Sequence, residues 1–237
     1  MKIEVWSDYV CPFCYIGKRR LEAALEQFPH RDKVEVTFKS FELDPNSSSE
    51  TNLSIHEVLA KKYGTSVEQA KKMSEGVGQQ ATTVGLNFNF DGMKPTNTFN
   101  AHRLAKFAET KGKEAEVTES LLKSYFIDSK HIGNLETLLQ ITQDAELNRE
   151  EVELLLSGTE FEESVRADEA EAREIGVQGV PFFVLNRKYA ISGAQPTEVF
   201  LETLQKVWEE ENTKTPLQTI TSKTELGATC TDDGCEV

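Results

Sequence analysis

The sequence predicts an α/β protein whose sheet combines a β-α-β unit near the start of the chain with a β-β-α unit near its end. Residues 2–6 alternate apolar and polar side chains, as a half-buried strand does, and residues 34–41 repeat this pattern. Between them, the apolar residues of 15–28 recur at helical spacing. Because one helix connects the two strands, we expect them to pair in parallel.

The β-β-α unit follows residue 176. Residues 180–185 are apolar and stop at a polar turn, after which residues 189–193 predict the returning strand. Pro196 opens an amphipathic helix that extends to about residue 210.

The residues between these units are mostly helical in pattern. Residues 86–90 alternate and predict a short strand or an extended loop. We therefore expect a sheet domain interrupted by a helical insertion and followed by a polar tail, with the boundaries 1–45 plus 176–211, 46–175 and 212–237. The helices predicted in the insertion are 55–63, 66–84, 98–111, 114–126, 134–145, 149–156 and 160–175.

Composition excludes several classes of function. The chain has 237 residues and a net charge of −14, which argues against a nucleic-acid partner. No apolar run is long enough to span a bilayer, and no signal-peptide pattern precedes the first strand. We therefore expect a cytoplasmic protein without a membrane partner. Paired cysteines in that compartment are more often catalytic, redox-sensing or metal-binding than structural.

The most informative motif is Cys11-Pro12-Phe13-Cys14, which lies at the turn between the first strand and the first helix. Pro12 suits the first helical position, which makes Cys11 the N-cap. There the backbone N–H groups and the helix dipole favour the thiolate. Cys14 lies one turn further on the same face, within reach of a disulfide, and we expect it to be the more buried, resolving thiol.

A C-x-x-C pair is also half of a common zinc site. Its position between a strand and a helix instead favours a redox pair. No histidine has a spacing to Cys, Asp or Glu that predicts a metal site. His102, near a helix start, either faces the cleft between the domains or is a surface or boundary residue; we favour the latter and leave it out of the catalytic set. We therefore assign no metal ligand.

Three motifs stand out in the sequence. They are Ser7-Asp8-x-x-Cys11-Pro12-Phe13-Cys14-Tyr15-Ile16-Gly17, Gly179-Val180-Pro181-Phe182-Phe183 and Gly193-Ala194-Gln195-Pro196. Together they resemble the DsbA family of thiol–disulfide oxidoreductases, and more narrowly its FrnE-like cytoplasmic branch. The resemblance covers residues 1 to about 211. It implies a thioredoxin-like fold with an inserted helical domain, with Cys11 as nucleophile. It also implies that Pro181 is cis and faces the cysteines, and that the backbone of Val180 docks a substrate chain as an added strand.

The two residues between the cysteines tune the redox potential of the pair. In DsbA the second of them is a histidine that helps to stabilise the thiolate. Pro12 and Phe13 offer neither a donor nor a charge at this place. We therefore predict a pair less oxidising than DsbA, whose potential is about −120 mV.

The polar tail carries a second cysteine pair, Cys230 and Cys235, separated by four residues that include Asp-Gly. Two readings stay open. The pair is either a second redox pair that exchanges electrons with Cys11 and Cys14, or a set of idle thiols on a tail. A zinc site built from all four cysteines is disfavoured, because it would occupy the reactive Cys11.

The predicted activity is dithiol–disulfide exchange with protein or small-thiol substrates. We expect no bound cofactor and redox exchange with cellular thiols, glutathione or a thioredoxin system among them. The oligomeric state stays open between monomer and homodimer. Alternatives are a glutathione-dependent enzyme, similar to kappa-class transferases or 2-hydroxychromene-2-carboxylate isomerases, and a redox-regulated chaperone. The former enzymes typically have serine where this chain has Cys11.

Overall fold

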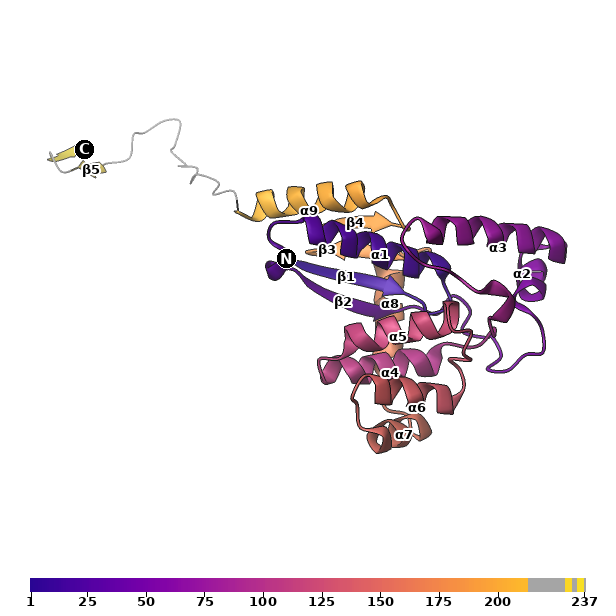
Figure 1. The fold of residues 1–237 in the computed structure, drawn as a ribbon. Coiled ribbons are helices and arrows are strands. Elements are labelled where there is room, and N and C mark those ends of the chain that lie inside the picture. The colour runs from indigo at the N-terminus through magenta and orange to yellow at the C-terminus, as the bar shows by residue number, and fades with distance from the viewer. Residues whose placement is uncertain (213–228, 232–233, 237) are drawn as a thin grey trace.

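A four-stranded sheet in the order β2-β1-β3-β4 lies at the centre of the computed structural model, which describes residues 1–212, 229–231 and 234–236 (Figure 1). Strands β1 and β2 pair in parallel, which confirms the predicted β-α-β unit. Strand β3 runs antiparallel to both β1 and β4, so the β-β-α unit completes the same sheet. The strands are β1 (Lys2–Ser7), β2 (Glu35–Ser40), β3 (Phe182–Leu185) and β4 (Tyr189–Ser192).

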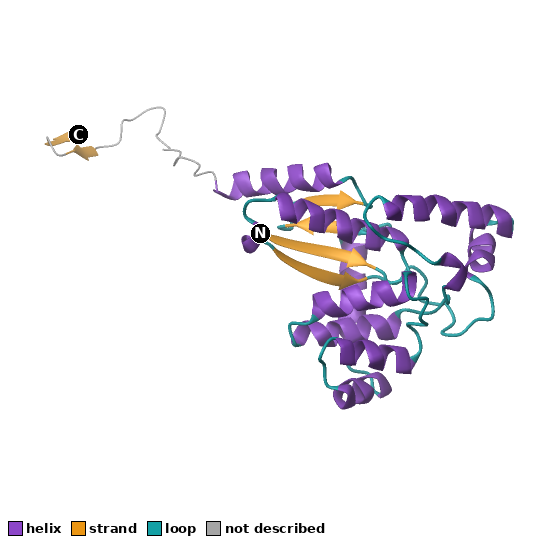
Figure 2. Ribbon diagram, viewed as in Figure 1, coloured by secondary structure: helices purple, strands orange, loops and turns teal. Residues whose placement is uncertain are grey.

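Helices cover both faces of the sheet (Figure 2). Helices α1 (Pro12–Gln27) and α9 (Thr197–Asn212) pack on the face to which Ile3 and Val5 point. Trp6 points to the opposite face, where it packs against Ala172 of α8 (Glu162–Glu174). This alternation along β1 is the period of a strand buried on both sides.

The insertion between β2 and β3 is helical, as predicted. Ser54 and Ser66 each begin a helix with a capping box. Residues 86–90 form no strand: the backbone N–H of Asn89 donates to Phe126, and a short 3₁₀ turn follows. The remaining elements are α2 (Ile55–Tyr63), α3 (Val67–Thr82), α4 (Phe99–Thr110), α5 (Glu114–Phe126), α6 (Leu135–Asp144), α7 (Arg149–Ser157) and the 3₁₀ turns η1 (Arg31–Lys33) and η2 (Phe90–Gly92).

Helix α1 is buried on two sides. Leu21 and Ala24 pack against the sheet and α9. Tyr15 and Ile16, near the cysteines, belong instead to the core of the insertion. The first turn of α1 is therefore held between the sheet and the insertion. The exact domain boundaries stay a prediction. Among the described residues, no helix is long and apolar enough to cross a bilayer.

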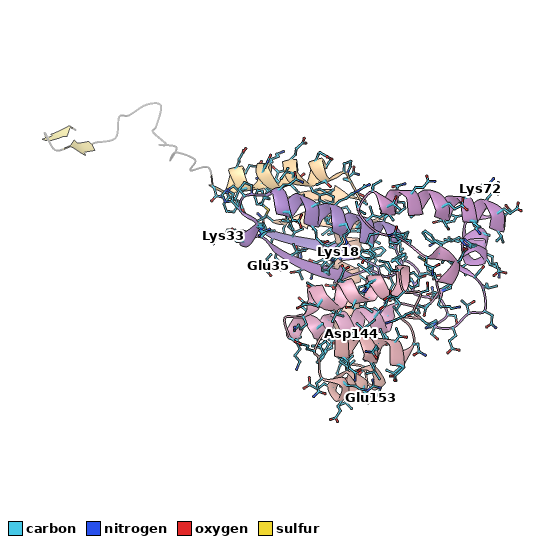
Figure 3. All side chains as sticks on the ribbon, viewed as in Figure 1. Lys18, Lys33, Glu35, Lys72, Asp144 and Glu153 are labelled. Carbon is cyan, nitrogen blue, oxygen red and sulfur yellow. The ribbon has the colours of Figure 1, made fainter. Side chains whose placement is uncertain are left out.

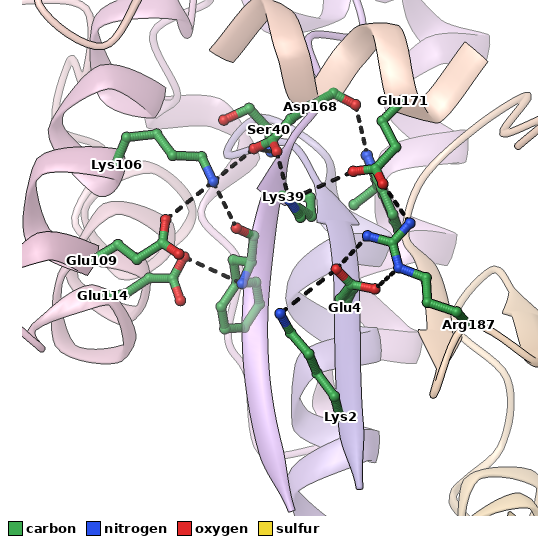
Figure 4. Close-up of polar contacts among 12 residues, drawn as sticks. Lys2, Glu4, Lys39, Ser40, Lys106, Glu109, Glu114, Asp168, Glu171 and Arg187 are labelled. Atoms are coloured by element: carbon green, nitrogen blue, oxygen red, sulfur yellow. Dashed lines mark hydrogen bonds and ion pairs between the residues drawn. The ribbon is translucent and has the colours of Figure 1, made fainter. Parts of the chain in front are cut away.

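Carboxylates of the insertion cover the outer edge of β2. The backbone N–H of Phe38 donates to Glu114 at 3.2 Å, and that of Ser40 donates to Asp168 at 3.0 Å (Figure 4). Beyond the strand, the N–H of Glu42 donates to Glu169 at 3.3 Å. Unpaired N–H groups at a sheet edge are open to pairing with another chain, and these side chains remove them from reach.

Two lysines neutralise the most buried of these carboxylates. Lys106 of α4 lies 2.7 Å from one oxygen of Asp168, and Lys39 of β2 lies 2.9 Å from the other (Figure 4). The Lys106 ammonium also donates to the carbonyl oxygen of Phe38. On the same face, Arg187 pairs with Glu4 and Glu171. The insertion is thus joined to the sheet by charge as well as by apolar packing.

Glu114 predicts a pH dependence of stability. Burial raises its pKa from 4.5 to about 7, because desolvation outweighs the hydrogen bond from Phe38. A folded-state pKa above the unfolded value stabilises the protein below pH 4.5, and this contribution is lost as the pH rises through about 7. Relative to Glu114→Gln, the wild type is expected to lose about 1–2 kcal/mol of unfolding free energy between pH 4.5 and 8, after discounting for partial exposure. Urea denaturation of both proteins between pH 4.5 and 8 measures this difference in unfolding free energy. Parallel pH profiles of the two proteins would contradict the prediction.

Candidate active site

Cys11 lies at the N-cap of α1, as predicted. Its backbone is extended, with φ −91° and ψ 111°, and Pro12 begins the helix. The turn that leads into the helix is closed by two backbone hydrogen bonds, from Cys11 N–H to Asp8 at 3.2 Å and from Cys14 N–H to Cys11 at 3.0 Å. Cys11 therefore lies at the positive end of the helix dipole.

Both cysteines are free thiols in this structure. Cys14 was expected to be the more buried, but Cys11 is 4 % exposed and Cys14 is 3 % exposed, so burial does not separate them. The insertion covers the first turn of α1, which the sequence did not reveal. Burial raises the pKa of the Cys14 thiol well above its ordinary value, and hydrogen bonding with Cys11 raises it further. The backbone N–H of Asp8 donates to the Cys14 sulfur at 3.4 Å.

The loop before β3 that contains Val180 and Pro181, the proline loop, lies against Cys11. The peptide bond between Val180 and Pro181 is cis. The Cys11 thiol donates to the carbonyl oxygen of Val180 at 3.5 Å. The carbonyl oxygen of Pro181 in turn accepts the N–H of Gly193, which ties the loop to the end of β4. The two predicted sites, 169 residues apart in sequence, are therefore in contact.

Gly17 allows α1 to approach this loop closely, which leads to a prediction. A Cβ at this position would lie 3.0 Å from Cγ of Pro181 and 3.1 Å from the ring of Phe183. Gly17→Ala is expected to push the loop away from Cys11, with a stability loss of about 1–2 kcal/mol and a fall in disulfide-exchange kcat/KM of about tenfold.

The matched control for this variant is Gly76→Ala in α3, where a Cβ would meet no atom within 4 Å. This variant is expected to gain about 0.5–1 kcal/mol and to keep full exchange activity. Equal activity of the two variants would show that the approach of α1 to the proline loop is unimportant.

The charged residues that follow Cys14 point away from the sulfurs. Lys18 is buried, and its ammonium lies 2.6 Å from Glu119 of α5 and 2.5 Å from Glu22 (Figure 3). Arg19 pairs with the same two carboxylates. Of the two tuning positions, Pro12 is half-buried and Phe13 is 37 % exposed. The ring of Phe13 therefore lies at the surface beside the buried sulfurs.

Sequence reasoning missed a buried pair beneath the cysteine turn. Asp8 is 1 % exposed, and one of its carboxylate oxygens accepts the N–H of Leu43 at 2.8 Å. The other oxygen lies 3.4 Å from Nε2 of His102, a residue 2 % exposed. His102 is therefore buried against the active-site turn, so the favoured surface or boundary position is wrong. The sequence shows only that each lies near a helix start; the packing of α4 against the turn brings them together.

The tail is described only as two short strands, β5 (Thr229–Thr231) and β6 (Gly234–Glu236), which pair antiparallel. In this register Cys230 lies opposite Cys235. Most of the predicted tail, residues 213–228, lies outside the described residues.

Two solved structures with low sequence identity to this chain share its fold. A 2-hydroxychromene-2-carboxylate isomerase is 14 % identical, with a TM-score of 0.65 over 89 % of this chain and 98 % of its own. The cytosolic disulfide reductase DsbM from Pseudomonas aeruginosa is 16 % identical, with a TM-score of 0.58 over 87 % of this chain and 100 % of its own. Identities this low establish the fold alone.

A much closer structure is that of the probable DsbA oxidoreductase SCO1869 from Streptomyces coelicolor. It is 40 % identical to this chain, with a TM-score of 0.85, and the match covers 100 % of this chain and 99 % of that one. The family model of the DSBA-like thioredoxin domain matches residues 2–205. The match therefore spans the sheet, the helical insertion and both segments of the site. This chain belongs to the DSBA-like thioredoxin domain family.

Proposed function

We propose that the protein is a dithiol–disulfide oxidoreductase that exchanges disulfides with protein or small-thiol substrates through Cys11 and Cys14. One observation carries this proposal: the Cys11 sulfur lies at the N-terminus of α1 and 3.5 Å from the Val180 carbonyl of the proline loop. A second thiol, Cys14, follows in the same turn. This is the arrangement that captures and then releases a thiol substrate.

The proposed reduction of a substrate proceeds in two exchanges. The Cys11 thiolate attacks one sulfur of the substrate disulfide, which forms a mixed disulfide and expels the other substrate sulfur as a thiolate. Cys14 then loses its proton and attacks the Cys11 sulfur. This step forms the Cys11–Cys14 disulfide and releases the second substrate thiolate. Two electrons pass from the protein to the substrate, and both substrate thiolates can take up protons. Oxidation of a substrate dithiol is the reverse.

The contact between the Cys11 thiol and the Val180 carbonyl supports a role of this loop in substrate docking. We propose that an extended substrate segment pairs with the backbone of Val180, next to Pro181, and so places its sulfur against Cys11. Main-chain pairing of this kind is tolerant of sequence, which suits an enzyme that acts on many chains.

The main alternative is a glutathione-dependent transferase or isomerase. The fold is shared with 2-hydroxychromene-2-carboxylate isomerase, but a pair of thiols in one turn favours exchange over conjugation. A direct comparison separates the two. We expect reduction of insulin disulfides in the presence of dithiothreitol, and no conjugation of glutathione to 1-chloro-2,4-dinitrobenzene. The opposite result would overturn the proposal.

The remaining proposals concern the tail and the setting of the enzyme. We propose that Cys230 and Cys235 form a second redox pair, supported by their opposed positions in β5 and β6. Unchanged turnover after removal of both would exclude exchange with Cys11. We also propose that the protein is cytoplasmic, which agrees with the name of the cytosolic reductase DsbM. The same proposal includes that it binds no cofactor and that glutathione or a thioredoxin system regenerates the cysteine pair.

A further inference from the structure

A cavity of about 130 Å³ lies beside the turn that carries Cys11. Five segments enclose it: the turn before α1, the loop after β2, helix α2, the segment before α4 and the end of α5. Val10, the neighbour of Cys11, contributes to its wall, so a group bound in the cavity would lie close to the reactive sulfur. The apolar lining consists of Val10, Leu43, Ile55, Val58, Leu59 and Pro95.

The polar part of the cavity contains a buried carboxylate whose partners are the N–H of Leu43 and the ring of His102. Asp8 lines the cavity, and its nearest ionisable neighbour is His102 at 3.4 Å, which is charged only when protonated. Among the residues that the structure describes, no Lys or Arg pairs with Asp8. Buried charges are costly unless they are paired. The cavity therefore presents a negative charge that lacks a permanent counter-charge.

Two hydroxyl groups accompany this carboxylate. Thr98 and Tyr125 also line the cavity, and they are 3 % and 2 % exposed. Within the described part of the chain, neither hydroxyl forms a hydrogen bond. Burial raises the pKa of Tyr125, and the negative charge of Asp8 raises it further, which places the phenol within the field of this carboxylate. Both hydroxyls are therefore available to accept a hydrogen bond from a ligand in the cavity.

The mouth of the cavity is neutral overall. Exposed Asp44 and Lys62 contribute one charge of each sign there. The unmatched charge is therefore that of Asp8 at the buried end. A ligand that fits has an apolar stem to contact the walls and a cationic end to reach the Asp8 carboxylate and the two hydroxyls.

We propose that this cavity binds the side chain of a lysine that lies near the reactive cysteine of a protein substrate. The proposal rests on the proposed function and adds a substrate preference to it. The four methylene groups of lysine match the apolar walls. Its ammonium group has three donors, which can be shared among the Asp8 carboxylate and the hydroxyls of Thr98 and Tyr125. The planar guanidinium of arginine has five donors in a fixed fork and would leave some unsatisfied.

The test uses short synthetic peptides that each carry one cysteine as a mixed disulfide with a chromogenic thiol. Each lysine peptide has a partner in which norleucine, the same stem without the ammonium, replaces lysine. Lysine is moved from one to three residues away from the cysteine on either side. At the best position the wild type is expected to prefer lysine over norleucine by about tenfold in kcat/KM.

Variants of the cavity separate recognition from chemistry. Thr98→Val and Tyr125→Phe keep the shape and remove one hydroxyl each, so the ratio of kcat/KM for the lysine peptide to that for the norleucine peptide should fall about threefold. Asp8→Asn should reduce the preference to about one. Because the backbone of Asp8 contacts Cys14, only the ratio of the two peptides is compared for that variant.

Equal rates for lysine and norleucine peptides at every position would overturn the inference, and so would a preference that Asp8→Asn leaves intact. In both cases the peptides still react, and the proposed oxidoreductase activity stands. Failure of both peptides to react would instead contradict the proposed function and this inference with it.

Discussion

Cys14→Ser is expected to accumulate a mixed disulfide between Cys11 and its substrates, whereas Cys11→Ser is expected to lose at least about 10³-fold in turnover. In the first variant the nucleophile remains at the N-cap of α1, but no neighbouring thiol releases what it has captured. In the second variant the remaining thiol, Cys14, has its pKa raised by burial and is a poor nucleophile at neutral pH.

Non-reducing electrophoresis and mass spectrometry of the trapped species measure this result, and the disulfide should map to Cys11. The double variant Cys11→Ser/Cys14→Ser is the control, because any adduct that it still forms involves the tail cysteines. Adducts that form at Cys14 in Cys11→Ser as fast as at Cys11 in Cys14→Ser would contradict the assigned roles.

Asp168→Ala is expected to lose about 3–5 kcal/mol of unfolding free energy. The carboxylate of Asp168 is buried and has three partners, the ammonium groups of Lys39 and Lys106 and the N–H of Ser40. Its removal leaves the buried Lys106 without its closest counter-charge and leaves the N–H of Ser40, at the edge of β2, without its acceptor. Both effects weaken the contact between the insertion and the sheet, and thus the support of the active-site turn.

Urea denaturation at pH 7 measures this loss. Glu151→Ala is the matched control, because Glu151 forms a single exposed pair with Lys111 at 2.8 Å, and it is expected to change stability by less than about 0.5 kcal/mol. A paired variant, Asp168→Leu with Lys106→Met, removes both charges and should recover part of the loss. Similar stability of Asp168→Ala and Glu151→Ala would show that the buried network contributes little.

Local patterns predicted the elements of this fold well. The alternation in residues 2–6 and the helical spacing after Cys14 indicated strand and helix because each pattern reflects which side chains are buried. The N-cap position of Cys11 followed from Pro12 alone, since proline is tolerated where no N–H is needed. Residues 86–90 show where local patterns fail to choose between structures. Their side chains alternate as in a strand, yet they form no strand, because the N–H of Asn89 donates to the carbonyl oxygen of Phe126 rather than to a neighbouring strand.

The sequence by itself determined the reactive turn, the parallel pairing of β1 with β2 and the helical nature of the insertion, because these depend on residues close together in the chain. Tertiary structure alone decided the equal burial of the two cysteines, the contact of Asp8 with His102 and the cavity closed by Thr98 and Tyr125. Those features join segments about 90 or more residues apart, and local periodicity carries no information about which distant helix packs on which turn.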